Sequence, residues 1–256
     1  MTHDALSEAR KELAAAFRLA VRFDLHEGID NHFTLMVPGS RRSFLLNGYG
    51  HHWSEITAGG LIVADMEGNL LAGEGVIEPS AFFIHSRVHL ASPRAACVLH
   101  THMPYATALS SIEDGRLEPI SQAALRFWDD VAYDDRYNGL AHDAAEGDRI
   151  AAALGDKRVL FLANHGVVVV GRSVAEAFDD LYFLERACRV QVLAMSTGAP
   201  PRRVLDEVAR ATFGNHDLAA PARTHFAALR RLLEPRPCRL RRSGGSAEGG
   251  ASANIA

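Results

Sequence analysis

Apolar and polar positions along the chain follow two different periods, and the period changes from one segment to the next. Residues 5–22 place apolar side chains three to four positions apart with charged residues between them, which predicts an amphipathic helix. From 31 to 71, short apolar runs are separated by turn residues such as Pro38-Gly39, so strands joined by tight turns are expected. Helical spacing returns over residues 80–91.

The rest of the chain adds further strands and a long helix. AACVLH at 95–100 predicts a short buried strand, and VLFLANHGVVVVG at 159–171 predicts a strand pair with NHG as its turn. Ser173, with Glu176 three residues later, has the spacing of a capping box and predicts the start of a long helix. Shorter helices are expected at 103–111, 145–154, 204–213 and 221–233, with a polar, aromatic and turn-rich stretch at 113–148.

Length and composition predict one folded domain. The chain has 256 residues, of which 48% are hydrophobic and 23% charged, as is ordinary for a globular protein. We expect a single domain over 1–235 with its core at about 10–200. The segment 236–256 is rich in Arg, Gly, Ser and Ala, cannot supply a packed core, and is expected to be a disordered tail.

Charge, hydropathy and cysteine content exclude several classes of protein. Lys and Arg number 27 against 31 Asp and Glu, so the net charge of -4 offers no overall attraction to nucleic acid or to an anionic membrane. No window approaches the roughly 20 apolar residues of a membrane span, and the N-terminal residues lack the apolar stretch of a secretory signal. Three scattered cysteines form no disulfide framework. We therefore expect a cytoplasmic protein that acts on a small molecule.

The histidine count of 13 is the unusual number, and three of these residues carry candidate chemistry. His100 and His102 lie two positions apart at the end of a predicted strand, so both rings point to the same face. His165 lies in the turn of the other strand pair. Histidines on two strand ends are typical of catalytic metal sites with open positions, and neutral imidazole suits Zn, Mn, Fe or Co. The pair alone also fits two edge residues without a metal.

At these residues the chain resembles the class II aldolase/adducin family. The resemblance implies an α/β fold with three α/β/α layers around a mostly antiparallel sheet, usually assembled as a tetramer with each active site near a subunit interface. It also implies that His100, His102 and His165 bind a divalent metal, with Zn favoured and Mn or Fe as alternatives. The matching stretches are GIDNHFT (28–34), FLLNGYGHHWSEIT (44–57), EPSAFFIHSRVH (78–89), VLHTHMPYATALS (98–110), PISQAAL (119–125) and LANHGVVVVG (162–171).

The chain departs from the sugar-phosphate aldolases of this family at the acid-base positions. Ala81 stands where those enzymes keep an acidic residue, and Ala123 stands where the fuculose-phosphate aldolases keep a catalytic Tyr. Glu78 and Gln122 are the candidate replacements for moving a proton. Of the phosphate-binding Gly-Asn-x-Ser pattern, Asn31 alone remains. A phosphorylated sugar is therefore not the expected substrate.

Other residues are expected to line the substrate pocket. Asn31, Gly50 and Ser80 match pocket positions of the family, and Tyr105 follows the histidine pair closely. Further aromatic and cationic residues near the family's site suit a small planar or carboxylated substrate. They are His51, His52, Trp53, Arg126, Phe127 and Trp128.

Four more histidines receive structural interpretations. His26 and His32 flank Asn31, and either could face the pocket, but a solvent-exposed loop position is expected. His85 and His89 lie one helical turn apart, a spacing that can itself bind a metal, but we expect one to pack beneath the site and the other to lie on the surface.

In these departures the chain is most similar to the adducin-type branch, which includes bacterial members, and three functions remain open. The first is a metal-dependent lyase, of aldolase or decarboxylase type, acting on a small non-phosphorylated carbonyl or carboxylate substrate. The second is a non-heme Fe(II) oxygenase acting on an aromatic or hydroxy acid. The third is a non-catalytic, adducin-like interaction module that works as an oligomer.

Overall fold

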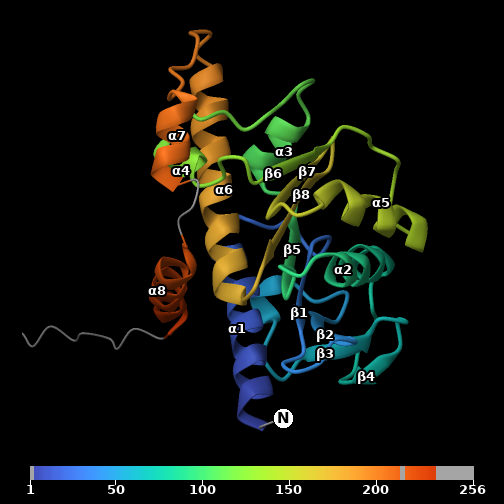
Figure 1. The fold of residues 1–256 in the computed structure, drawn as a ribbon. Helices are drawn as coiled ribbons and strands as arrows, with labels where there is room; N and C mark the ends of the chain where they lie inside the picture. The colour runs from blue at the N-terminus through green and yellow to red at the C-terminus, as the bar shows by residue number, and fades with distance from the viewer. Residues whose placement is uncertain (1–2, 214–216, 235–256) are drawn as a thin grey trace, which may run out of the picture.

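An eight-stranded sheet lies between two layers of helices in the computed structural model, which describes residues 3–213 and 217–234 (Figure 1). The strand order is β4-β3-β2-β1-β5-β8-β7-β6, and among the described strand pairs β6 with β7 is the one that runs parallel. This confirms the predicted α/β fold with a mostly antiparallel sheet. The strands are β1 (His32–Met36), β2 (Ser43–Asn47), β3 (Leu61–Asp65), β4 (Leu70–Ala72), β5 (Cys97–Thr101), β6 (Val131–Asp134), β7 (Val159–Leu162) and β8 (Gly166–Gly171).

The helices cover both faces of the sheet (Figure 1). α2 and α5 pack on one face, α1, α3 and α6 pack on the other, and α4 and α8 pack against α6. α7 lies against α4. The helices are α1 (His3–Arg22), α2 (Pro79–Ala91), α3 (Pro104–Ser110), α4 (Gln122–Leu125), α5 (Ala144–Leu154), α6 (Val174–Met195), α7 (Asp206–Phe213) and α8 (Ala219–Arg230).

The alternation of side chains along β5 divides the core into two parts. Cys97 and Leu99 join the large cluster formed with α1 and α6, whereas Val98 joins the cluster formed with α2 and α5. All five residues of β5 are buried, because both faces of this central strand are covered. His100, two positions after Val98, therefore faces the α2 side.

The structure confirms most of the predicted elements and corrects one region. The stretch 113–148 contains β6 and α4, and does not consist of turns alone. β6 has four residues at the sheet edge and is mostly half-buried, so it has no continuous apolar run to reveal it. The tail at 236–256, including Cys238, lies outside the described residues.

The capping box predicted at the start of α6 is half formed. The Ser173 side chain accepts a hydrogen bond from the Glu176 backbone N–H, as predicted. The Glu176 carboxylate accepts instead from the backbone N–H and Nε of Arg172. Ser173 therefore fixes the start of α6, and Glu176 ties the preceding residue to it.

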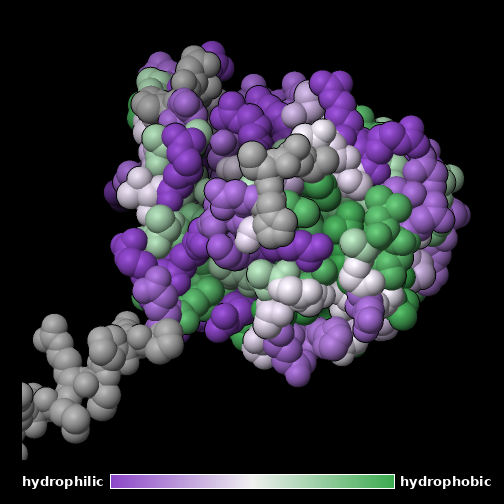
Figure 2. Space-filling model, turned by 90° about the horizontal axis from the view of Figure 1, so that it is seen from below, coloured by the Kyte–Doolittle hydropathy of each residue, from purple (hydrophilic) through white to green (hydrophobic). Residues whose placement is uncertain are grey.

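The β4 edge of the sheet carries uncovered apolar side chains. Leu70, Leu71 and Val76 are each more than 40% exposed. Seen from below, hydrophobic residues gather on the side where β2, β3 and β4 lie (Figure 2).

None of the helices in the described part of the chain has an apolar stretch of the length that a membrane span requires.

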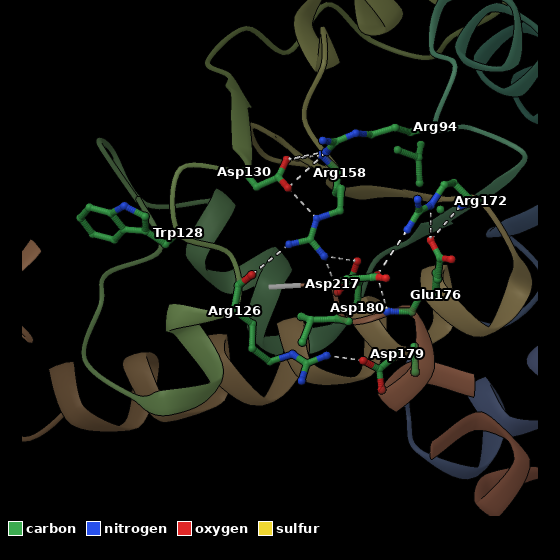
Figure 3. A pocket seen from close by; sticks show the side chains of 15 residues that line it. Arg94, Arg126, Trp128, Asp130, Arg158, Arg172, Glu176, Asp179, Asp180 and Asp217 are labelled. Carbon is green, nitrogen blue, oxygen red and sulfur yellow. Dashed lines mark hydrogen bonds and ion pairs between the residues drawn. The ribbon is translucent and has the colours of Figure 1, made fainter. Parts of the chain in front are cut away.

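A network of ion pairs surrounds a hollow of about 490 Å³ where β7 begins and β8 ends (Figure 3). Arg158 lies at its centre, with Nε 2.6 Å from Asp130 and Nη1 2.8 Å from Asp180. Arg126 pairs with Asp179 in the same way. Burial raises the pKa of Asp180 to about 6, although Arg158 acts to lower it. The ion pairs around the hollow therefore hold together the start of β6, the start of β7 and α6.

Replacement of Arg158 by Met should lower the free energy of unfolding by about 3–5 kcal/mol, because it leaves Asp180 buried without its partner. The control is Arg172→Met, which removes an ion pair with Glu176 whose Arg side chain is 65% exposed. That change should cost less than about 1 kcal/mol. Denaturant unfolding measures both, and equal effects would contradict a structural role for the network.

Candidate metal centre

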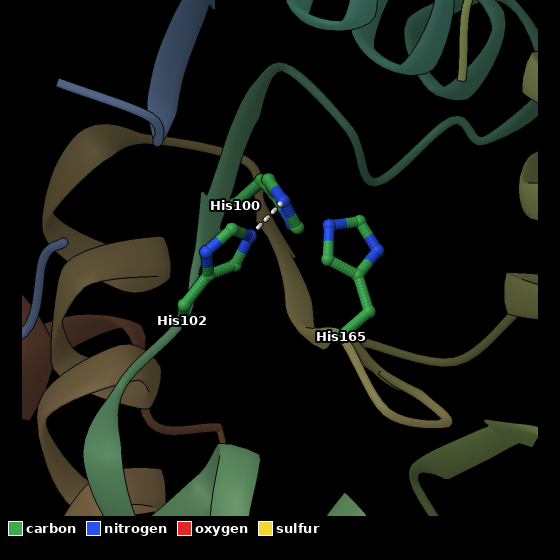
Figure 4. Close-up of side chains that lie close together, drawn as sticks. All are labelled: His100, His102 and His165. Carbon is green, nitrogen blue, oxygen red and sulfur yellow. Dashed lines mark hydrogen bonds between the residues drawn. The ribbon is translucent and has the colours of Figure 1, made fainter. Parts of the chain in front are cut away.

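Three histidines converge at the opposite end of β5 and β8 from the ion-pair network (Figure 4). His100 lies in β5, His102 just after it, and His165 in the turn between β7 and β8. Their candidate ligand atoms all lie within 4.8 Å of one another, and the Nε2 atoms of His100 and His102 are 3.2 Å apart. Two nitrogens bound tetrahedrally to one Zn²⁺ lie about 3.3 Å apart. His100 and His102 have the spacing of two ligands of a single ion, and His165 lies close enough to be a candidate third ligand.

Backbone pairing between β5 and β8 brings the three histidines together. Thr101 pairs with Val167, so β8 begins beside the end of β5. Asn164 adopts a left-handed conformation with φ of 56°, which turns the chain and directs His165 toward the pair. A Cβ atom on Gly166 would lie 2.4 Å from the Thr101 carbonyl oxygen. Glycine is therefore required at this position of the NHG turn.

Hydrogen bonds on the far side of two rings leave their Nε2 atoms unprotonated. His100 Nδ1 lies 3.0 Å from the Val167 carbonyl oxygen, which can only accept, so Nδ1 carries the hydrogen. His102 Nδ1 lies 2.6 Å from Glu27 Oε2 and donates to it in the same way. Two unprotonated Nε2 atoms then face each other at 3.2 Å. Their lone pairs repel unless a cation lies between them.

Burial keeps His100 and His165 in the neutral form that binds metals. His100 is 1% exposed, and burial, followed by the neighbouring histidines, lowers its pKa well below the ordinary value. Burial, with a smaller contribution from His102, lowers the pKa of His165 to about 4.

Glu185 of α6 holds the segment that follows His102. Its two carboxylate oxygens accept the backbone N–H groups of Tyr105 and Ala106, each at 2.9 Å. These are the first amides of α3, whose own N-cap residue, Met103, provides no side-chain hydrogen bond. Glu185 therefore caps α3 and fixes the backbone after the histidine pair.

Three of the predicted site residues lie next to the cluster or its neighbours. Asn31 is 2% exposed, and its Oδ1 accepts from the His102 N–H at 3.4 Å, while its buried Nδ2 has no partner among the described atoms. Glu78 caps α2, accepting the Ala81 N–H at 2.7 Å. Ser80 Oγ lies 2.5 Å from Glu78 Oε2 and 3.3 Å from His32 Nε2.

Three other predicted site residues have no such contact. Gly50 lies in an exposed turn with φ of 93°. The half-buried Tyr105 ring lies 5.4 Å from the Arg189 guanidinium. Gln122 is exposed at the start of α4, beside α6 and not beside the cluster (Figure 1). Within one chain, the structure does not bring Gln122 to the histidines.

Within one chain, the structure does not place Trp53 or the residues after PISQ beside the histidines. Trp53 is fully buried and packs against Phe17. Phe127 is in the core, and Arg126 and Trp128 line the hollow around Arg158. Trp53 is buried in the core because its ring is apolar. Arg126 and Trp128 follow α4 and therefore lie at the opposite end of β7.

His32 and His89 were placed wrongly by sequence reasoning. His32 is not in an exposed loop: it lies in β1, is 4% exposed, and pairs directly with His100 across the sheet. Their rings are 4.8 Å apart. His85 is fully buried against His32, and His89 is drawn inward by a hydrogen bond to the Ala95 carbonyl. The alternate spacing of His32 and Thr34 was the available sign of a polar face on β1.

Comparison with known proteins now gives the family. Residues 11–192 match the model of the Class II Aldolase and Adducin N-terminal domain. The chain belongs to the class II aldolase/adducin family. The match covers both the histidine-bearing strands and the helices that enclose them.

Members of this family with different roles are similar to the chain. It is 39% identical over 201 residues to alpha-adducin of Mus musculus, covering 77% of the chain and 27% of alpha-adducin. The crystal structure of an aldolase II superfamily protein from Pseudomonas syringae has a TM-score of 0.84 and 37% identity, covering 90% of this chain and 93% of that one. The L-fuculose 1-phosphate aldolase from Glaciozyma antarctica has a TM-score of 0.79 and 26% identity, covering 88% and 90%.

The free energy of unfolding should fall by more than about 2 kcal/mol when metal-free protein is taken from pH 7 to pH 5. Burial lowers the pKa of His32 to about 3 and those of His89 and His165 to about 4. Below pH 6.5 these histidines bind protons in the unfolded chain but not in the folded protein, so the free energy of unfolding decreases as pH falls. Asp180 and Glu185, with raised pKa values, act oppositely but are fewer.

Urea unfolding at each pH measures this dependence. The variant His89→Gln removes one of the titrating rings and should show a smaller loss between pH 7 and pH 5. A free energy of unfolding that stays constant or rises on acidification would contradict the neutral state of the buried histidines.

Proposed function

We propose that this protein is a metal-dependent lyase that cleaves a C–C bond in a small, non-phosphorylated carbonyl or carboxylate substrate. The observation that carries the proposal is the pair of unprotonated Nε2 atoms on His100 and His102, 3.2 Å apart, with His165 beside them. We propose these three histidines as ligands of a divalent metal, with Zn²⁺ favoured and Mn²⁺ or Fe²⁺ as alternatives. A three-histidine site leaves further coordination positions open for substrate.

The residues around the cluster have separate proposed roles. A divalent cation bound here supplies Lewis-acid polarisation of a substrate oxygen. Asn31 offers its unpaired Nδ2 as a donor to a second oxygen, because this buried group has no other use among the described atoms. Glu78 takes the proton that the substrate releases, replacing the acidic residue that related aldolases keep at the position of Ala81. Gly50 and Tyr105 are proposed to line the pocket entrance.

The charges beside the cluster support a non-phosphorylated substrate. Glu27 binds His102 at 2.6 Å, and the Glu78 carboxylate lies 4.0 Å from His32. These carboxylates occupy the surroundings where a phosphate dianion would need cationic or N–H donors.

Removal of one proposed ligand tests the metal. His102→Ala should reduce the divalent metal content of protein purified without added metal at least tenfold, because only two of three ligands remain. The control His51→Ala changes an exposed histidine outside the cluster and should leave the content unchanged. Elemental analysis measures both, and a full metal content in the His102 variant would refute this ligand set.

Replacement of Glu78 tests the proton carrier. Glu78→Gln should lower kcat about 10²–10⁴-fold with little change in metal content, since the amide keeps the shape but cannot take a proton. Glu74→Gln, an exposed neighbour, is the matched control. The assay follows cleavage of non-phosphorylated hydroxycarbonyl and hydroxyacid compounds without oxygen. A requirement for O₂ and Fe²⁺ would favour the oxygenase alternative.

Similarity to alpha-adducin supports a second candidate, a non-catalytic interaction module. For this alternative, no carbonyl or carboxylate compound should raise the melting temperature of any metal form, because a ligand that binds the folded state must stabilise it. For the lyase, at least one such compound should raise it.

We also propose that the chain works as a homo-oligomer, with a tetramer favoured. The apolar β4 edge, with Leu71 56% and Val76 65% exposed, offers surface that a second copy would cover. Gln122 can act in the proposed reaction only if a neighbouring copy brings its α4 to the histidines.

A further inference from the structure

A row of polar side chains runs between the sheet and α2, starting next to the histidine cluster. His32 Nδ1 lies 2.7 Å from His85 Nε2, and His85 Nδ1 lies 2.6 Å from Thr34 Oγ1. Thr34 Oγ1 also lies 2.8 Å from His89 Nε2. The row ends at the Ala95 carbonyl oxygen, 2.6 Å from His89 Nδ1. His32, Thr34 and His85 are at most 4% exposed, so protein groups must satisfy one another here.

The Ala95 carbonyl fixes the direction of every hydrogen bond in this row. A carbonyl only accepts, so His89 donates through Nδ1, and its Nε2, in the neutral ring, must accept from the Thr34 hydroxyl. The Thr34 oxygen is then the acceptor for His85 Nδ1–H. His85 Nε2 accepts in turn from His32 Nδ1–H. All three rings carry their hydrogen on Nδ1, and His32 Nε2 is left unprotonated.

The unprotonated Nε2 of His32 faces a hydroxyl that it shares with Glu78. Ser80 Oγ lies 3.3 Å from this nitrogen and 2.5 Å from Glu78 Oε2. When Glu78 is ionised, the Ser80 hydroxyl donates to Glu78. When Glu78 carries a proton, its O–H donates to Ser80 Oγ and the Ser80 hydroxyl turns to His32. Glu78 and Ser80 are hydrogen-bonded to each other in both states, and in the second state Ser80 also donates to His32 Nε2.

We propose that Thr34, His85 and His89 are positioning residues that hold His32 in its Nδ1–H form, so that Ser80 supports Glu78 in both protonation states. The second half of this proposal rests on the proposed function, in which Glu78 carries the proton. With His32 in the opposite form, an Nε2–H would face Ser80, and the Ser80 hydrogen would have no acceptor at His32 when protonated Glu78 donates to Ser80. The Ala95 carbonyl at the far end of the row therefore determines which ring nitrogen of His32 carries hydrogen.

The test measures which ring nitrogen carries hydrogen in each histidine. Imidazole ¹⁵N chemical shifts of metal-free protein should show His32, His85 and His89 in the Nδ1–H form. Thr34→Val keeps the side-chain shape but removes the hydroxyl, so His85 loses the acceptor for its Nδ1–H. His85 and His32 should both change to the Nε2–H form in this variant. Thr34→Ser restores the hydroxyl and should restore the wild-type pattern.

A control and a kinetic measurement separate polarity from packing. Ser86→Ala removes a hydroxyl from α2, the helix that carries His85 and His89. Ser86 is 1% exposed and its hydroxyl has no partner among the described atoms, so this change should leave the ring forms unchanged. Thr34→Val should lower kcat at least about tenfold with KM unchanged, and Thr34→Ser should recover it. An Nε2–H form of His32 in the wild type, or unchanged ring forms in Thr34→Val, would overturn the proposal. Because the ¹⁵N measurement needs neither metal nor substrate, failure of the lyase assay leaves this result standing.

Discussion

The antiparallel pairing of β5 with β1 on one side and β8 on the other is the constraint on which the site depends. This register sets His32 beside His100 and starts β8 next to Thr101. Because helices cover both faces of β5, the His100 imidazole is withdrawn from water and must find a defined hydrogen-bond partner. That partner is the Val167 carbonyl, and the Glu27 carboxylate is the corresponding acceptor for His102. The nitrogens turned toward the cluster are consequently unprotonated.

The two ends of the central strands illustrate opposite uses of buried polarity. Around Arg158 every arginine meets a carboxylate, so the charges are matched within the protein. At the histidine end, ring nitrogens and the Asn31 amide remain without protein partners. The convergence of three imidazoles beside an unpaired amide points to a ligand, whereas the paired charges around Arg158 point to a structural role.

Membership of the class II aldolase/adducin family does not by itself choose a reaction, since similar chains include an L-fuculose 1-phosphate aldolase and alpha-adducin. The distinction lies in single positions around an unchanged scaffold. Ala81 can hold neither a proton nor a metal, but its backbone N–H fixes the Glu78 carboxylate one turn earlier, next to Ser80. The proposed proton carrier is thus placed by the start of α2.

Local pattern determined the elements of this protein. Periodicity, the NHG turn and the spacing of His100 and His102 were enough to predict most helices and strands, and the family resemblance of these stretches implied the layered fold and the three-histidine site. Tertiary structure alone decided what surrounds them. The pairing register between β1 and β5 places His32, which was expected in a loop, in a buried position beside His100. Packing of α2 brings His85 and His89 into contact with His32 and Thr34. Such contacts join residues more than 50 positions apart, and no local period encodes them, because strand pairing and helix docking are set by the packing of the whole sheet.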